Sequence, residues 1–251
     1  MTQIWPTTLG GDQDIGVISF RLFDIPVKVR PSFLVIAAIL GWQTGDLTRV
    51  FAWIGIIFFS ILIHELGHAL TARGIGSTVE IELNAVGGLT SWTTPAEGFG
   101  PGRRALVAAA GSAVGVVFGG LVWLVVAVTG PYTGMTAFVL NTLIWVNLFW
   151  GLLNWLPVRP LDGGHLLTSL LEKIAPEKGE RIANVIFFVT AAAAVAIGLW
   201  LRLIFVALLS GWLLWGEITR SRPRRGPVQI PPMSYDDVED DRPVGERDQV
   251  D

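Results

Sequence analysis

Long apolar runs separated by short polar stretches dominate the pattern of this chain. Three runs are long enough to cross a bilayer as a single helix, which requires about 20 apolar residues. These three predicted spans are residues 51–73, 104–129 and 135–157. The apolar run at 182–218 is too long for one span, so we expect two short spans that turn near residues 198–202. With a shorter run at 32–42 as the weakest span, the pattern predicts a polytopic α-helical membrane protein with about six transmembrane helices.

Four short segments between the apolar runs alternate apolar and polar residues, as half-buried β-strands do. They are residues 17–23, 25–30, 78–83 and 86–92. Each pair is close enough in sequence to form a β-hairpin, and Gly87-Gly88 marks a bend or bulge in the second. We expect both small β-hairpins beside the membrane on its cytoplasmic side. An exposed strand edge there can pair with an extended segment of another protein.

The composition supports a membrane protein and limits the metal chemistry that is open to it. The chain has 51% hydrophobic and 16% charged residues, and its mean hydropathy of +0.56 is too high for a soluble enzyme. It has no cysteine, which excludes disulfides and thiolate ligands, so nitrogen and oxygen atoms must hold any metal. The N-terminal residues have no positively charged flank before a short apolar core, so we expect no cleaved signal peptide.

Positive charges indicate how the chain is oriented in the membrane. With six spans and both termini in the cytoplasm, 16 of the 18 Lys and Arg residues fall on the cytoplasmic side. Only Arg49 and Arg202 then fall outside. We therefore expect a multi-pass protein of the plasma membrane, with an N-terminal segment of short strands (1–31) and a membrane-embedded core (32–219). The remaining residues, 220–251, are first basic and then acidic, and this composition predicts a disordered cytoplasmic tail.

The pentapeptide His64-Glu65-Leu66-Gly67-His68 lies inside the first of the three long spans. Histidines four apart share one face of a helix, so both imidazoles can bind one metal ion, and the glutamate between them can hold a water on that metal. Ionisable groups at membrane depth are costly and are functional by default. A purely structural histidine pair would need other buried partners for both rings, which makes that interpretation much weaker.

A second group of polar residues lies at the end of the third long span. Its sequence is Asn154-Trp155-Leu156-Pro157-Val158-Arg159-Pro160-Leu161-Asp162-Gly163-Gly164-His165. The two prolines cannot continue a helix and the two glycines permit backbone shapes that other residues avoid, so we expect Asp162 on irregular chain. The second and third long spans run there and back across the membrane, which returns this segment to the side where the histidine span ends. A loop that dips inward would bring Asp162 to His64 and His68.

Together the two groups predict a catalytic zinc site. His64, His68 and Asp162 supply two nitrogens and one oxygen and leave a fourth position for water, which is the mark of catalytic zinc. We expect one Zn2+ per chain, with Glu65 as the general base that takes a proton from the water. The amide of Asn154 can donate to the oxyanion or bind the substrate backbone.

The two motifs together resemble those of the site-2 protease family of intramembrane zinc metalloproteases. The resemblance rests on HELGH within a span, followed about ninety residues later by an asparagine, a proline and LDGG at a span end. It implies His64, His68 and Asp162 as zinc ligands and Glu65 as a catalytic residue, and Asn154 matches the family's asparagine. The chain resembles a minimal bacterial-type core without the PDZ or CBS domains of some relatives. The implied partners are the lipid bilayer and a membrane-anchored protein substrate, such as an anti-sigma factor or a pro-protein, and no nucleic acid.

Three other functions are open to such a sequence. A zinc-binding membrane transporter would carry polar ligands at several depths, whereas these groups gather near one side of the membrane. A catalytically inactive scaffold is disfavoured because Glu65 and all three ligands are intact. A different membrane metalloprotease would use a glutamate as its third ligand, but no glutamate after residue 129 fits as well as Asp162. His165 can support the ligands, contact the substrate or lie at a helix start after Gly164, and direct metal ligation is disfavoured because three ligands already complete an open site.

Small residues recur at a spacing of four in the second long span. They are Gly111, Gly115 and Gly119. This spacing lets two membrane helices approach closely, so we expect these glycines to serve packing and not chemistry.

Overall fold

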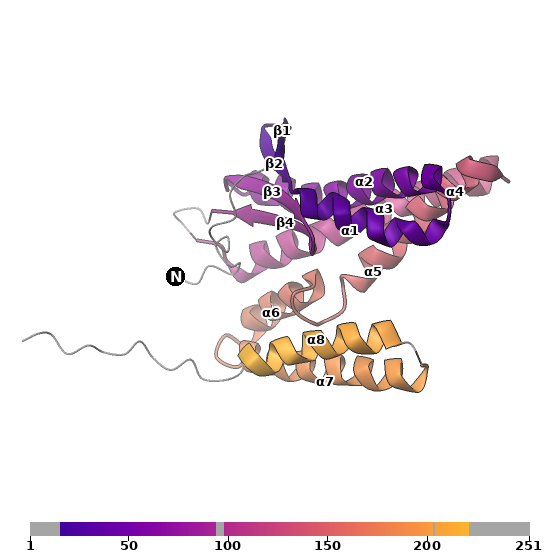
Figure 1. Ribbon diagram of the computed structural model, residues 1–251. Coiled ribbons are helices and arrows are strands. Elements are labelled where there is room, and N and C mark those ends of the chain that lie inside the picture. The colour runs from indigo at the N-terminus through magenta and orange to yellow at the C-terminus, as the bar shows by residue number, and fades with distance from the viewer. Residues whose placement is uncertain (1–15, 94–97, 203, 221–251) are drawn as a thin grey trace, which may run out of the picture.

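The computed structural model describes residues 16–93, 98–202 and 204–220 of the chain. Within these ranges the protein consists of helices and one small sheet, and the sheet lies at one end of the long helices (Figure 1). Residues 1–15 of the predicted N-terminal segment and the tail after residue 220 lie outside the described residues, as do the expectations that concern them.

Four helices of the described chain are long and apolar enough to cross a membrane. They are α2 (Leu47–Gly74), α3 (Pro101–Thr129), the continuous helix Gly134–Leu153 and α7 (Gly179–Trp200). The first three correspond to the three long predicted spans. The continuous helix is built from α4 (Gly134–Trp145), a π-helical turn (Val146–Trp150) and α5 (Gly151–Leu153). Helices of this length and composition identify a membrane protein.

The last apolar run forms the expected helical hairpin of α7 and α8 (Ile204–Arg220). The helix breaks directly after Trp200, inside the predicted turn interval. The weakest predicted span forms α1 (Pro31–Gly41). With 11 and 17 residues, α1 and α8 are shorter than the other four helices, so the count of six crossings stays a prediction.

Local chemistry sets where the helices begin. Pro31 and Pro101 are the first residues of α1 and α3, at a position where a helix needs no N–H donor. Helix α2 starts after Asp46, whose carboxylate accepts a hydrogen bond from the backbone N–H of Thr48 at 3.0 Å. The sequence therefore supplies a start signal at each of these boundaries.

The four predicted strands form one sheet and not two separate hairpins. They are β1 (Ile18–Leu22), β2 (Ile25–Val29), β3 (Val79–Asn84) and β4 (Gly87–Trp92), in the order β1-β2-β3-β4. Each hairpin is antiparallel, and a parallel pairing of β2 with β3 joins the two, with Val27 opposite Ile81. This pairing links segments that α1 and α2 separate in sequence. It leaves β4 as an edge strand.

One face of the sheet is apolar and packs against α2. Ile25, Val27 and Val29 alternate with the half-buried Pro26 and Lys28 along β2 and are at most 3% exposed. Leu62 and Ala69 of α2 belong to the same buried cluster. This apolar contact fixes the sheet against the part of α2 that carries the histidines.

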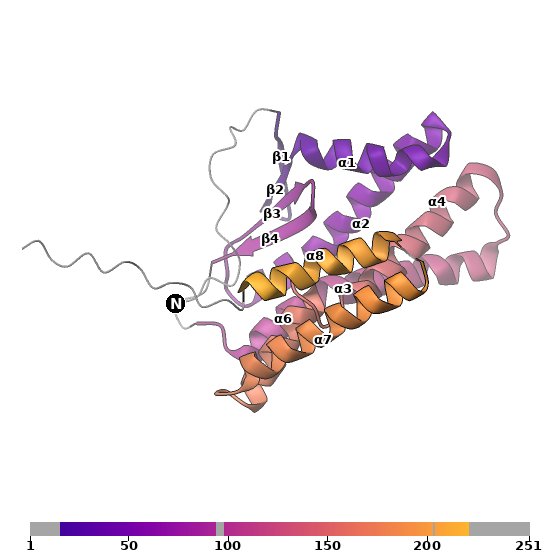
Figure 2. The ribbon, with the colours of Figure 1, turned by 60° about the horizontal axis from the view of Figure 1, so that its bottom comes forward.

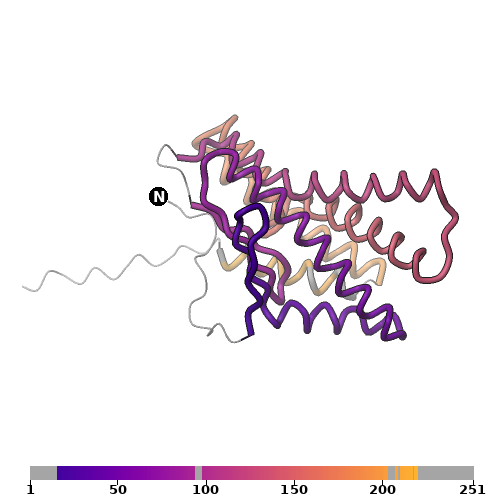
Figure 3. The backbone as a smooth tube through the Cα atoms, turned by 90° about the horizontal axis from the view of Figure 1, so that it is seen from above, coloured from indigo at the N-terminus to yellow at the C-terminus, as the bar shows by residue number. Residues whose placement is uncertain are grey.

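Helix α6 (Asp162–Ile174) connects the two parts of the helical bundle. It contacts α3 and α7. In Figure 1 α6 lies between α2 and the α7–α8 hairpin, and Figure 2 shows α7 and α8 side by side. The sheet lies at one end of α2 and α3, and the connection from α3 to α4 lies at the opposite end (Figure 3). The end of α2, the start of α3 and the sheet therefore share one end of the molecule.

The junction of β2 and β3 carries an ion pair whose contribution can be measured. Arg30 donates from Nε to Oε1 of Glu82 at 2.8 Å and from Nη2 to Oε2 at 3.2 Å, and these hydrogen bonds lower the pKa of the Glu82 carboxyl. We expect Arg30→Met to cost about 1 to 2 kcal/mol of stability near neutral pH. Thermal unfolding in detergent should then occur about 2 to 8 °C lower than in the wild type.

The same contribution should depend on pH. The pKa of Glu82 is lower in the folded protein than in the unfolded chain, where the pKa of a glutamate is about 4.3. The stabilisation is therefore complete above that value and is lost as the pH falls through the lowered pKa. The difference between wild type and Arg30→Met should shrink accordingly in acid. Lys28→Met is the control, because Lys28 and Glu80 pair with side chains 42% and 41% exposed; an equal loss there would contradict the assignment.

Candidate metal centre

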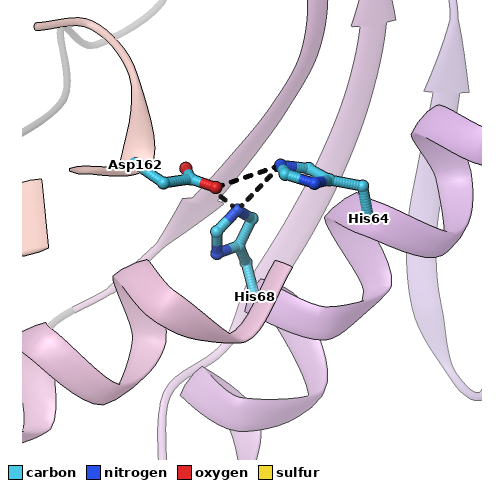
Figure 4. A group of neighbouring side chains, drawn as sticks. All are labelled: His64, His68 and Asp162. Carbon is cyan, nitrogen blue, oxygen red and sulfur yellow. Dashed lines mark hydrogen bonds and ion pairs between the residues drawn. The ribbon is translucent and has the colours of Figure 1, made fainter. Parts of the chain in front are cut away.

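Helix α2 presents both predicted histidines on one face, one helical turn apart. Their Nε2 atoms lie 3.2 Å from each other, and both rings converge on the same point as Asp162 (Figure 4). His68 is only 7% exposed. This convergence follows from local structure, because residues four apart on an α-helix lie one above the other.

Asp162 completes the group, but it does so from a helix. The prediction that Asp162 lies on irregular chain was wrong, because it is the first residue of α6. The irregular segment ends one residue earlier, where Leu161 caps the helix in an extended conformation. A carboxylate in the first turn of a helix is favoured by the helix dipole, which adds to the stability of this arrangement.

The two glycines after Asp162 serve close packing and not unusual backbone shapes. Both are buried within α6, and neither has a positive φ. A Cβ at Gly163 would overlap the backbone of Trp155, and one at Gly164 would lie 2.8 Å from the carbonyl carbon of Val158. The start of α6 can therefore lie directly on the preceding turns only because these two residues have no side chain. This close approach fixes the position of Asp162.

The distances between the three ligand groups suit a tetrahedral metal ion. Nε2 of His64 lies 3.3 Å from Oδ2 of Asp162, and Nε2 of His68 lies 3.2 Å from Oδ1. Zinc bonds of about 2.0 to 2.1 Å in a tetrahedron place ligand atoms about 3.3 Å apart, so the observed spacing suits zinc. Throughout the described ranges, these are the residues that form a group able to hold a metal ion. The predicted ligand set is thus brought together in space.

Helix α3 supports the ligands through residues that the sequence analysis missed. Nδ1 of His68 donates to the backbone carbonyl of Val107 at 2.7 Å, which leaves the lone pair of Nε2 free for a metal. The hydroxyl of Ser112 donates to Oδ2 of Asp162 at 2.6 Å. A Cβ at Gly111 would overlap the imidazole of His68, so this glycine makes room for a ligand in addition to its expected packing role.

Glu65, the expected general base, is a residue of α2 whose carboxylate contacts β4, and it is 6% exposed. The hydroxyl of Thr90 donates to its Oε2 at 2.6 Å. A Cβ at Gly88 would overlap the same carboxylate. The sequence analysis assigned Gly88 to a bend and did not identify Gly88 or Thr90 as neighbours of Glu65, although the period of a strand places both on one face of β4.

The other residues that the sequence analysis named do not belong to the ligand group. The backbone carbonyl of Asn154 accepts a hydrogen bond from the N–H of Gly163 at 2.7 Å, which ties the end of α5 to the start of α6. A role of its side chain in catalysis stays a prediction. His165 lies one turn beyond Asp162 on α6, outside the three-ligand group. Glu172, one of the glutamates after residue 129, pairs with Arg104.

Known proteins are similar to this chain in sequence. The profile of peptidase family M50 matches residues 132–197, a range that includes Asp162. A protein of Synechocystis sp., named provisionally as a zinc metalloprotease, is 36% identical over 70% of this chain and 50% of its own length. A zinc metalloprotease of Methanocaldococcus jannaschii is 29% identical over 81% of this chain and 60% of its own length. The chain therefore spans only about half to three fifths of the curated relatives it matches.

A solved structure extends the likeness to nearly the whole fold. The site-2 protease from Methanocaldococcus jannaschii superimposes with a TM-score of 0.57 at 26% sequence identity. The match covers 84% of this chain and 98% of that chain. The family resemblance of the two sequence motifs is thereby confirmed, and this chain is similar to peptidase family M50 and to a site-2 protease.

Proposed function

We propose that this protein is an intramembrane zinc metalloendopeptidase that hydrolyses peptide bonds in or near the transmembrane segment of membrane-anchored proteins. One observation carries the proposal: His64, His68 and Asp162 converge beside Glu65 within a bundle of membrane-spanning helices. Buried ionisable groups are costly unless a metal or a partner compensates them. The zinc metalloprotease names of the relatives support the same chemistry.

The side chains of the centre can divide the hydrolysis between them. When bound, zinc supplies a Lewis acid that polarises the scissile carbonyl and makes a water easier to deprotonate. Glu65 takes a proton from the water as the water oxygen bonds to the carbonyl carbon. It returns that proton to the nitrogen as the C–N bond breaks, which yields a carboxyl group and an amine. The hydrogen bond from His68 to Val107 keeps the ligand ring in a fixed orientation.

We propose that the substrate lies extended along β4. A peptide can add to a free strand edge through backbone hydrogen bonds, and β4 is an edge strand of the sheet. Gly88 and Thr90 of β4 contact Glu65, so a segment paired with this strand would pass near the general base. In this arrangement the amide of Asn154 donates to the oxyanion or to the substrate backbone.

We further propose six crossings of a bacterial plasma membrane, with both termini in the cytoplasm. Helices α1 and α8 would supply the two short crossings. The sheet shares one end of the molecule with Arg73, Arg103 and Arg104 at helix ends, and this supports a cytoplasmic position for both hairpins. Membrane-anchored regulators such as anti-sigma factors, or pro-proteins, are the proposed substrates, and nucleic acid is not a proposed partner.

A zinc transporter and an inactive scaffold are the alternatives, and both would use the same ligands. A transporter needs polar ligands at successive depths, whereas the ligand group of the described residues sits at a single place between α2 and α6. A scaffold would not need a glutamate buried beside the ligands with its own hydrogen-bond donor. Neither alternative therefore accounts for Glu65.

Glu65→Gln tests the proposed function directly. The amide has the size of the carboxylate but cannot take a proton from water, and all three ligands stay in place. Cleavage of a membrane-anchored reporter by the purified protein should fall by at least about 100-fold. Metal analysis should find about one zinc per chain in both proteins. Equal cleavage would remove Glu65 as the base, and a zinc-loaded wild type without any cleavage would favour a transporter or a scaffold.

Asp162→Asn tests the third ligand. A neutral amide is a poor zinc ligand, and even the loss of an outer partner weakens zinc binding by about 10- to 100-fold, so the affinity should fall by more than about 100-fold. Competition with a soluble chelator measures this affinity. Asp46→Asn is the control, because this exposed residue lies at the start of α2, where it caps the helix and pairs with Arg49, and asparagine caps equally well. An unchanged affinity in Asp162→Asn would exclude the carboxylate as a ligand.

Gly111→Ala tests the space that α3 leaves for a ligand. The added methyl group would overlap the imidazole of His68 and turn it away from Asp162, so the purified variant should contain much less zinc. Gly115→Ala is the matched control one turn further along α3, because its Cβ would meet only atoms of Asn147 at 3.8 and 3.9 Å. A normal zinc content in Gly111→Ala would contradict the assigned role of this glycine.

A further inference from the structure

Thr90 is a buried polar residue that neither the ligand set nor the proposed reaction employs. It is 4% exposed and lies opposite Ile81 in the pairing of β4 with β3. Its Oγ1 lies 2.6 Å from Oε2 of Glu65 and 3.2 Å from the backbone oxygen of the same residue. A single side chain therefore contacts Glu65 at two points.

Strand β4 confines the carboxylate of Glu65 from two directions. The backbone at Gly88 lies against Oε1 and the neighbouring carbons, and the hydroxyl of Thr90 meets Oε2. A glutamate side chain has several rotatable bonds, and ordering it costs conformational entropy. A buried carboxylate also needs a donor to replace water. The contact with Thr90 meets both demands and selects one orientation of the carboxylate.

We propose that Thr90 is a positioning residue for the general base, an inference that rests on the proposed function of Glu65. Its hydroxyl holds the carboxylate in the orientation that accepts a proton from the attacking water. A hydroxyl has one donor and two acceptor sites. It can donate to Oε2 of the carboxylate. It can equally accept from a protonated Oε2 while it donates to the backbone oxygen of Glu65. The contact therefore persists on both sides of the proton transfer.

Packing offers a simpler explanation for a threonine at this position. Threonine is β-branched and suits a strand, and its methyl group fills buried space. Valine has the same shape and would then serve as well, whereas serine would leave a small cavity. The positioning role makes the opposite prediction, because serine keeps the hydroxyl and valine removes it. The two explanations therefore rank the two variants in opposite order.

The test compares Thr90→Val with Thr90→Ser in the full chain, purified in detergent and loaded with zinc. Cleavage of the membrane-anchored reporter gives kcat and KM, and metal analysis gives the zinc content. We expect Thr90→Val to lower kcat by about 10- to 100-fold, a part of what a complete general base contributes, with KM and zinc content unchanged. Thr90→Ser should stay within about threefold of the wild type. Thr219→Val in α8 is the control and should match the wild type, because the hydroxyl of Thr219 donates to backbone oxygens of its own helix.

Each result decides the question. Equal kcat in Thr90→Val and wild type, or a larger loss in Thr90→Ser than in Thr90→Val, would overturn the positioning role. If Thr90→Val does not fold or does not hold zinc, Thr90→Ser and Thr90→Ala replace the comparison, because they differ only in the hydroxyl, and equal kcat there would overturn the role. Failure of the proposed function would be recognised separately, since wild type and Glu65→Gln would then show the same cleavage or none.

Discussion

The whole structure depends on holding three ionisable side chains together in apolar surroundings. Two imidazoles and a carboxylate lie 3.2 to 3.3 Å from one another among membrane-spanning helices, where an isolated charge is costly. The arrangement is stable because the three groups face each other, and Nδ1 of His68 and Oδ2 of Asp162 are also hydrogen-bonded to α3. A cation between the three groups would compensate the charge of the carboxylate further, so the geometry and the electrostatics both favour a metal ion.

Helix α3 shows that close packing and chemistry need the same small residues. Gly67 of α2 lies so close to α3 that a Cβ there would come within 2.8 Å of the Cα of Gly111. This contact brings the carbonyl of Val107 and the hydroxyl of Ser112 within reach of the ligands. Gly119, further along the helix, serves packing alone, against the continuous helix at Asn147. Small residues at a spacing of four therefore indicate a contact between helices, but they do not show which part of that contact adjoins a site.

The sheet gives the centre its second wall. The helices hold the three ligands, while β4 holds Glu65 through Gly88 and Thr90. The parallel join of β2 with β3 makes this possible, because it turns two marginal hairpins into a four-stranded sheet with an apolar face against α2. The proposed general base and the two histidines thus share one helix, whereas Asp162 comes from α6. The edge strand that adjoins Glu65 is also the one open to an extended peptide.

The sequence by itself determined the long spans, the four strands and the histidine pair, because each rests on a local period of the chain. It also singled out Asp162, through its motif, but placed it on irregular chain, since a glycine in a sequence does not show whether it serves an unusual φ or a close contact. The join of the two hairpins and the contacts of Val107, Ser112 and Thr90 were decided only by the tertiary structure. Those three residues meet their partners across separations of 39, 50 and 25 positions, and no local pattern encodes which distant segments pack together.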